Sequence, residues 1–299
     1  MRILVTGATG RVGGAVAAQL VRFPGVRVKA LTRQRGVTIP GAEMVAGDLT
    51  DPASLDLTGV DAVFLVFPSV VADHAARDLI AALAPRPIVF LSAHGAAPGN
   101  SIMGSHAYLE DLIASAGPYT FLRSSGFAAN TLAWAPQLRQ SDTLRWIFPA
   151  ARRALIHEAD LAAVAVRALT SDGHEGKAYH LTGPEQLTQA AQLETLGSVL
   201  GRPLRFEEVP PARAASLFPA SLADAIVAGQ SAFVDHPEPV TDEVARLTGR
   251  PARSYESWAR DHASEFRSGV GRAAAGQLED RDWVGEFRSG GWAGAGGSA

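Results

Sequence analysis

The chain has 299 residues, of which 47% are hydrophobic, and a formal net charge of −3 at pH 7. This length allows a large buried core, whereas the charge balance and the lack of a Lys/Arg cluster exclude an electrostatic footprint for nucleic acid. The chain has no cysteine, which excludes disulfides, thiolate nucleophiles and Cys-ligated zinc. We therefore expect a cytoplasmic α/β protein without a metal site or a membrane span.

Three glycines follow the first apolar run of the chain. The run at 3–5 leads into Gly7, Gly10 and Gly13, spaced G-x-x-G-x-x-G, and a helix is predicted directly after them at 11–22. Glycine allows a sharp turn out of the strand, close approach of the backbone to a phosphate and tight packing of the helix on the sheet. The N–H groups and positive dipole of the helix then face the ligand. This turn predicts a site for the pyrophosphate of a dinucleotide.

Short apolar runs and helical stretches alternate over the first 123 residues. Strands are predicted at 2–6, 26–32, 43–46, 62–66, 87–92 and 119–123, and helices at 11–22, 70–84 and 103–116. Such alternation is typical of a doubly wound, parallel, Rossmann-like sheet. Ligands of these sheets bind at the carboxyl ends of the strands, so we expect the site there.

The remaining chain predicts a small C-terminal α+β substrate lobe at 124–267, interleaved with the core. Its expected elements are a helix capped by Asp160 and running to about Leu169, a strand at 179–182, a helix capped by Thr188 and ended by Gly201, extended chain at 204–206, and helices at 241–248 and 254–266. Residues 268–299 are rich in glycine and repeat the segment Glu-Phe-Arg-Ser-Gly, which predicts a disordered tail.

The end of the second predicted strand favours NADPH over NADH. NAD sites usually place an acidic residue there, whereas this chain has Arg33 and Arg35, whose guanidinium groups could grip a 2′-phosphate. Arg11 is predicted to point toward the same pocket. The alternative is that these arginines are solvated surface charges. Asp48 is expected either to accept a hydrogen bond from the adenine amino group or to stabilise a turn.

Several segments resemble one known family when they are taken together. They are TGATG at 6–10, LTR at 31–33, GDLTD at 47–51, LRSSGF at 122–127 with Asn130, LTGPE at 181–185 and LTGRP at 247–251. As a set they resemble the NmrA-like branch of the atypical short-chain dehydrogenases/reductases, over about residues 1–267. The resemblance implies a Rossmann-like core, NADP(H) binding, and kinship with quinone and azo-type reductases, isoflavone-reductase-like enzymes and redox-sensing co-regulators.

The Tyr-x-x-x-Lys dyad of typical short-chain dehydrogenases is missing from the helix predicted at 103–116. Tyr108 has no Lys four residues later, and His106 and Glu110 stand in that relation instead. Glu110 is predicted to orient the His106 imidazole and raise its pKa, which would make it a proton donor near neutral pH. The alternative is that His106 and Glu110 form an exposed pair on the helix with no catalytic role. His94 is a second candidate on the substrate side, or a plain loop residue.

We therefore expect hydride transfer from NADPH to a quinone-like or conjugated carbonyl compound, whose delocalised anion needs little proton assistance. A tailoring step in secondary metabolism is one setting for such a reaction. Ser124 and Asn130 are expected to donate hydrogen bonds to the substrate. Phe67 and Phe127 are expected either to wall the site or to pack in the core. The residues expected to bind the cofactor are Gly7, Thr9, Gly10, Arg11, Val12, Arg33, Asp48, Leu49, Phe67, Pro68 and Ser92.

Two other functions remain open at this point. One is a non-catalytic NADP(H) sensor that regulates a protein partner, and the other is an isomerase or cyclase that keeps the cofactor but performs no net redox step. Fold analogy does not separate them, because function depends on the site. The expected partner is a small molecule, and self-association into a homodimer is left open.

Overall fold

The computed structural model describes residues 1–34, 36–67, 73–96, 102–218 and 223–267. Its main layer is a seven-stranded parallel sheet in the order β3-β2-β1-β4-β5-β6-β9. The strands are β1 (Arg2–Val5), β2 (Arg27–Thr32), β3 (Glu43–Ala46), β4 (Ala62–Leu65), β5 (Ile88–Ala93), β6 (Tyr119–Ser124) and β9 (Lys177–Leu181). The predicted Rossmann-like sheet is confirmed. Its strand order reverses between β1 and β4, which is where such sheets bind their ligands.

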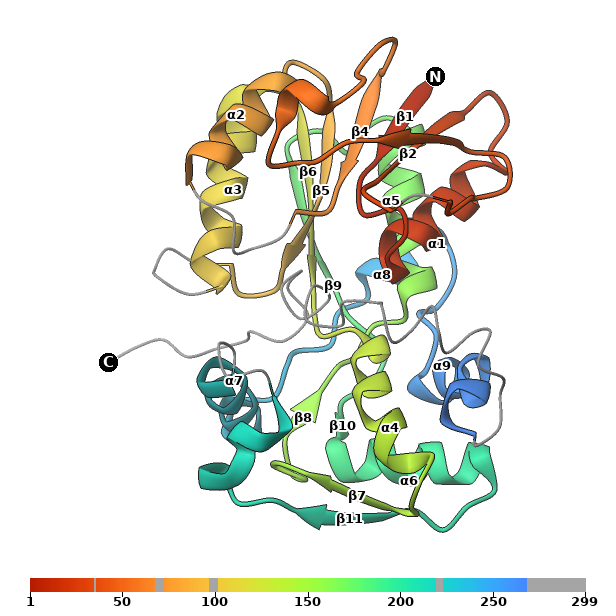
Figure 1. Cartoon of the computed structure of the whole chain (residues 1–299), viewed down its shortest axis with the longest axis vertical. Helices are drawn as coiled ribbons and strands as arrows, with labels where there is room; N and C mark the ends of the chain where they lie inside the picture. The colour runs from red at the N-terminus through yellow and green to blue at the C-terminus, as the bar shows by residue number, and fades with distance from the viewer. Residues whose placement is uncertain (35, 68–72, 97–101, 219–222, 268–299) are drawn as a thin grey trace.

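Helices cover both faces of this sheet (Figure 1). One face carries α1 (Arg11–Leu20), α5 (Glu158–Thr170) and α8 (Glu243–Thr248), and the other carries α2 (Asp73–Leu83) and α3 (Ile102–Ala116). Every residue of β4 and β5 is buried, as their unbroken apolar runs predict for strands covered on both sides.

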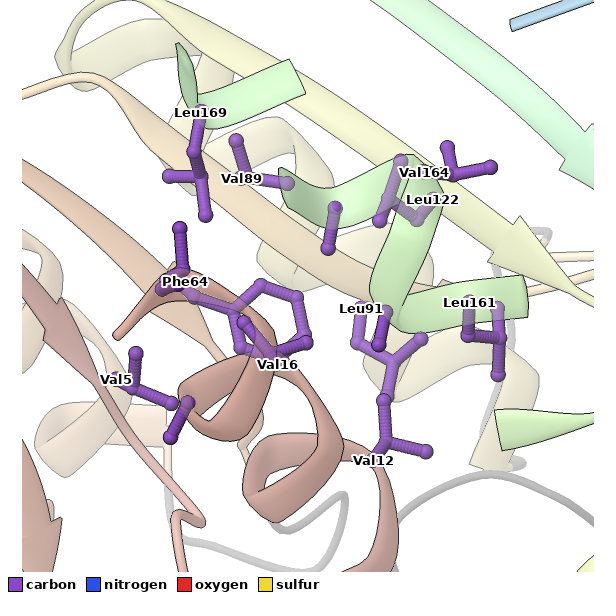
Figure 2. Close-up of a cluster of buried hydrophobic side chains, with 14 of the residues drawn as sticks. Val5, Val12, Val16, Phe64, Val89, Leu91, Leu122, Leu161, Val164 and Leu169 are labelled. Carbon is purple, nitrogen blue, oxygen red and sulfur yellow. The ribbon is translucent and has the colours of Figure 1, made fainter. Parts of the chain in front are cut away.

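The larger core cluster lies between the sheet and the helices α1 and α5. Figure 2 shows Val12 and Val16 of α1 and Leu161 and Val164 of α5 packed with side chains of the sheet, with Val16 beside the ring of Phe64. All of these are less than 10% exposed. This packing fixes the start of α1, and with it the glycine turn, against the sheet.

A smaller lobe lies beyond the carboxyl ends of the strands (Figure 1). Its elements are η2 (Ala128–Trp134), α4 (Ala135–Leu138), β7 (Thr143–Trp146), β8 (Arg152–Arg153), β10 (Leu187–Thr188), α6 (Gln189–Leu200), β11 (Arg205–Glu208), η3 (Pro211–Leu217), α7 (Ala223–Asp235), α9 (Tyr255–Asp261) and η4 (Ala263–Phe266); one further 3-10 turn, η1 (Pro52–Ser54), belongs to the core. Trp134, Trp146, Tyr255 and Trp258 belong to the hydrophobic cluster of this lobe. The strand β9 and the helices α5 and α8 return from this part of the chain to the main sheet.

The caps of the lobe helices were partly predicted. Thr188 caps α6 by accepting a hydrogen bond from the Ala191 N–H, and Gly201 ends that helix in the left-handed conformation, as expected. The prediction that Asp160 caps α5 is wrong, because the His157 ring accepts the hydrogen bond from the first turn of that helix.

The buried carboxylate of Asp160 has other partners. It accepts a hydrogen bond from the Arg253 N–H at 2.6 Å and pairs with the guanidinium of the same residue. The tail predicted at 268–299 lies outside the described residues. None of the helices in the described part of the chain has the length and apolar character that a membrane span needs.

Candidate functional site

The glycine turn has the geometry that a phosphate site needs. Gly7 has φ of +59°, and Gly10 is the N-cap of α1, so no side chain occupies the first N–H groups of the helix. A Cβ on Gly13 would lie 2.2 Å from the Gly7 carbonyl oxygen. The chain therefore requires glycine where the helix start meets the strand end, and the open helix terminus can receive the pyrophosphate. These contacts fit the dinucleotide that the spacing predicts.

The neighbours of the glycines contribute to this site in different ways. The Val12 side chain is buried in the core and Thr9 is half-buried, so the Val12 contribution is limited to its backbone. The Nη2 atom of Arg11 lies 3.7 Å from the Glu265 carboxylate on η4. Arg11 thus has a carboxylate partner in this structure, and its predicted orientation toward a 2′-phosphate stays a prediction.

Glu265 belongs to a cluster of histidines and carboxylates that ties the last folded segment to the starts of α1 and α5. His262 contacts Glu265 through Nδ1 at 2.7 Å and Glu158 through Nε2 at 2.6 Å. Burial lowers the pKa of His262, but its hydrogen bonds to the two carboxylates outweigh burial and raise it to about 9. A charged His262 therefore links the two acidic groups near neutral pH.

The ends of β2 and β3 hold the residues predicted to contact the adenosine part of the cofactor. Arg33 is exposed, and Arg35 lies outside the described residues. Asp48 accepts hydrogen bonds from the N–H and hydroxyl of Thr50, which lower its pKa, and the charge of Arg33 lowers it further. One Asp48 oxygen thus stabilises a turn, while Arg33 stands close enough to act on its charge. Leu49 beside it is half-buried.

The prediction that Glu110 orients His106 is wrong. The Glu110 carboxylate accepts a hydrogen bond from Ser92 Oγ at 2.6 Å and binds the Arg123 guanidinium with both oxygens, at 3.0 and 2.5 Å. This two-pronged pair raises the pKa of Arg123. The Ser92 hydroxyl is therefore engaged as a donor to Glu110, and the negative charge of Glu110 is compensated by Arg123 on the neighbouring strand β6.

His106 lies deep in the protein, where its side chain is 1% exposed. Neither ring nitrogen has a hydrogen-bond partner among the described residues, and the ring packs against Phe90 with the centroids 5.9 Å apart. Burial lowers the pKa of His106 to about 4, although the charge of Glu110 opposes this shift. The predicted proton donor with a raised pKa is therefore not present at this position.

His94, the second predicted candidate, lies directly after the carboxyl end of β5. It follows β5, its N–H donates to the Ser124 carbonyl at 2.8 Å, and its ring is half-buried. Its Nδ1 atom lies 3.3 Å from Nδ1 of His180, which stands opposite Arg123 in the register of β6 and β9. Burial lowers the pKa of His94 from its ordinary value. This places a histidine pair at the edge of the sheet where the ligand is expected.

The other residues predicted near the substrate divide between the core and a pocket. Phe67 and Phe127 pack in hydrophobic clusters, as the packing alternative holds, and Pro68 lies outside the described residues. Ser124 is buried, and its hydroxyl donates weakly to the Ser92 carbonyl at 3.4 Å. Asn130 lines a small pocket of the lobe that is partly open to solvent.

Sequence reasoning missed several polar residues of this region. Arg123 lies at the end of a predicted strand, and an arginine on a strand buried on both faces is itself a signal for a buried partner. His180 lies within the strand predicted at 179–182, but no sequence feature near it indicated a contact with His94. Arg153 and Glu238 form a buried ion pair at 2.9 Å and lie in segments without a helical or strand pattern. No group of three or more His, Asp or Glu side chains in the described residues is arranged to hold a metal ion.

Comparison with known proteins identifies the family. A model of the NmrA-like family matches residues 1–88. The chain is 40% identical over 278 residues, 88% of its own length and 99% of the relative's, to (4-alkanoyl-5-oxo-2,5-dihydrofuran-3-yl)methyl phosphate reductase of Streptomyces griseus. The chain belongs to the NmrA-like family. This NmrA-like protein is also 33% identical over 285 residues, 88% of its length and 99% of the relative's, to the NAD(P)H azoreductase of Xenophilus azovorans.

A solved structure supports the same fold for this NmrA-like protein. The NADPH-dependent quinone oxidoreductase of Escherichia coli, complexed with NADPH, superimposes with a TM-score of 0.73 at 24% identity, covering 88% of this chain and 100% of that one. The NmrA-like chain thus shares its family with an NAD(P)H-dependent reductase, and its glycine turn has the geometry that a dinucleotide site needs.

Proposed function

We propose that this protein transfers hydride from NADPH to an electron-poor conjugated carbonyl compound, a quinone or an acylated unsaturated lactone. The observation that carries the proposal is the His94–His180 pair at the carboxyl edge of β5 and β9, beside Ser124. The Streptomyces griseus relative supports the substrate class, because the dihydrofuranone in its name carries an alkanoyl group.

In this proposal the glycine turn binds the cofactor, and the histidine pair transfers a proton to the substrate. NADPH, when bound along the glycine turn, supplies the hydride. Addition of that hydride to the conjugated carbon leaves a delocalised anion on the substrate, which needs one proton. His94 Nδ1 faces His180, so Nε2 is the atom that would deliver the proton, and His180 is placed to share the charge. The Glu110–Arg123 pair holds the strand ends in position.

The test is anaerobic mixing of the full chain with NADPH and a panel of quinones and acyl dihydrofuranones, followed at the nicotinamide absorbance. We expect NADPH oxidation with at least one class of acceptor. Binding of NADPH without oxidation across the panel would overturn the reductase and favour the sensor. Substrate conversion without a change in nicotinamide absorbance would favour the isomerase or cyclase.

His94→Gln is expected to lower turnover about tenfold without changing NADPH affinity. This loss is below the roughly 100-fold or more typical of general acid catalysis, because the anion is delocalised. Protonated His94 is depleted as pH rises through its lowered pKa, so the wild-type rate should fall across that range and the variant should lose this dependence. His106→Leu is the matched control and should retain turnover. A full rate in His94→Gln, or an equal loss in His106→Leu, would remove His94 from the mechanism.

Arg33→Asp is expected to shift cofactor preference from NADPH to NADH. A charge-assisted hydrogen bond contributes about 1.5–3 kcal/mol, so the ratio of kcat/KM for NADPH over NADH should fall by about tenfold or more. Arg27→Asp is the control, because Arg27 is an exposed arginine at the opposite end of the same strand. An unchanged ratio in Arg33→Asp would show that Arg33 is only a surface charge.

A further inference from the structure

One short segment contacts the strand ends that carry both histidines of the His94–His180 pair. It is the chain at 236–243, called the connector below, which leaves α7 in the lobe and reaches the first residue of α8 on the main sheet (Figure 1). Pro237 and Pro239 restrict its backbone on either side of Glu238. The connector is therefore suited to hold side chains in fixed places at the carboxyl edge of the sheet.

The connector binds the backbone of His180 on the open side of β9. This strand is the last one of the main sheet, and an edge strand leaves backbone groups without a strand partner. The His180 N–H donates to Glu243 Oε2 at 3.0 Å, and its carbonyl accepts a hydrogen bond from the Thr241 hydroxyl at 2.5 Å. Two side chains of the connector thus take the place of a further strand at this residue, and they fix the backbone from which the His180 ring projects.

Thr241 is itself held in place by the residue that follows β9. Its N–H donates to Thr182 Oγ1 at 2.9 Å, and the Thr182 hydroxyl donates its own proton to the Gly183 carbonyl. Thr182 is 1% exposed, so this anchor is shielded from water. The Thr241 hydroxyl has a single proton, and it is engaged by the His180 carbonyl.

The same connector reaches the strand end that holds His94. The His94 N–H donates to the Ser124 carbonyl at 2.8 Å, and Gly126 follows two residues later. Glu238 accepts hydrogen bonds from the Gly126 N–H at 3.2 Å and from Arg153 Nη2 at 2.9 Å. Both histidines are therefore tied to one segment, through Glu238 on the side of His94 and through Thr241 and Glu243 on the side of His180.

The contact between the two rings depends on this placement. The rings stand at 78° with their centroids 5.4 Å apart, and the two Nδ1 atoms are separated by 3.3 Å. This separation is at the long end for a hydrogen bond, so a displacement of His180 by a few tenths of an ångström would break it. Burial lowers the pKa of His94 most strongly; the charge of Glu238 opposes this shift, and those of His180, Arg123 and Arg153 add to it.

We propose that Thr241 is a positioning residue for the proton transfer, because its hydroxyl fixes the His180 backbone and so keeps the His180 ring within hydrogen-bond distance of His94. The link to a reaction rests on the proposed reductase function. Thr241 acts through His180 and handles no substrate proton itself. Its effect on the rate should therefore depend on the presence of the His180 ring.

The first measurement compares turnover of the full chain and its variants with NADPH and an acceptor from the panel. Thr241→Val keeps the shape of the side chain and removes the hydroxyl, so we expect kcat to fall about fivefold, the size of one hydrogen bond, with an unchanged KM for NADPH. Thr241→Ser restores the hydroxyl and should recover the rate. Thr248→Val is the matched control on α8, because that hydroxyl donates to the Val244 carbonyl of its own helix.

A double variant distinguishes positioning from a general structural role. If Thr241 acts through the His180 ring, Thr241→Val should cause no further loss of kcat in a His180→Gln background, whereas independent effects would add. Additive losses would overturn the proposal, and so would a wild-type rate in Thr241→Val or a failure of Thr241→Ser to recover the rate. Thr241→Ala gives the same test if Thr241→Val fails to fold.

The second measurement needs no turnover. The ¹⁵N NMR signals of the His94 ring report its contact with His180, so Thr241→Val should shift them toward their positions in His180→Gln, and Thr248→Val should leave them in place. Unchanged His94 signals in Thr241→Val would overturn the proposal. Shifted signals together with no NADPH oxidation by the wild type would retain the positioning of the pair and overturn the reductase, so the two failures are distinguishable.

Discussion

Gly13→Ala is expected to weaken cofactor binding and to destabilise the protein strongly. The added Cβ would lie 2.2 Å from the oxygen and 2.6 Å from the carbon of the Gly7 carbonyl, and 2.8 Å from the Thr6 carbonyl oxygen. All three are backbone atoms of the strand end, so no side-chain rotation relieves the overlap. The helix start must move away from the sheet, and the phosphate site opens with it. We expect a loss of NADPH affinity of about 100-fold or more, roughly 2.8 kcal/mol.

The expected loss of stability is about 3 kcal/mol, at the upper end of the range for overpacking. Alanine gains at most about 1 kcal/mol over glycine inside a helix, which does not offset this cost. Gly14→Ala is the matched control. It lies one position further along the same helix, where the Cβ would meet only the Ala8 carbonyl oxygen, at 3.2 Å. Urea unfolding and NADPH fluorescence titration of both variants check the prediction, and wild-type affinity in Gly13→Ala would contradict it.

The sheet and the glycine turn could be predicted because local sequence determines them. A strand covered on both faces must be apolar at every position, and β4 and β5 satisfy this over their full length. Gly13 is likewise fixed by contacts within the first turn of the chain.

The lobe could not be predicted in the same way because its strands depend on distant partners. Thr143 of β7 pairs with Arg205 of β11, and Arg153 of the two-residue strand β8 pairs with Leu187 of β10. Strands this short carry no readable period, so β7, β8 and β10 were not predicted. The helix ends marked by Thr188 and Gly201, the extended chain at 204–206 and the helices predicted at 241–248 and 254–266 were recognised.

The candidate site shows how a tertiary contact overrides a local pattern. His106 and Glu110 have the spacing of a helical pair, but Arg123 reaches Glu110 from the neighbouring strand and offers two charge-assisted hydrogen bonds. The helix turns His106 into the core, where a neutral ring is favoured. The sequence identified His94 only as a residue that follows a strand end. Its partner His180 lies on β9, the last strand of the main sheet, which pairs with β6 and brings the two rings together.

Arg153→Met is expected to destabilise the protein by about 3–5 kcal/mol, because it leaves the buried Glu238 carboxylate without its cation. Hydrogen bonds from the Gly126 and Ala154 N–H groups remain, but they do not supply a compensating charge. Arg145→Met is the control. Arg145 pairs with Glu207 at 3.0 Å, with side chains 64% and 55% exposed, and such surface pairs contribute less than about 1 kcal/mol.

The double variant Arg153→Met/Glu238→Gln separates charge from packing. It removes the uncompensated carboxylate while one amide oxygen still accepts from the backbone, so it should recover part of the stability that the single variant loses. Urea unfolding of the single and the double variant measures both losses. A double variant that is no more stable than the single one would place the loss in the packing of Arg153 against Phe233 rather than in the charge of Glu238.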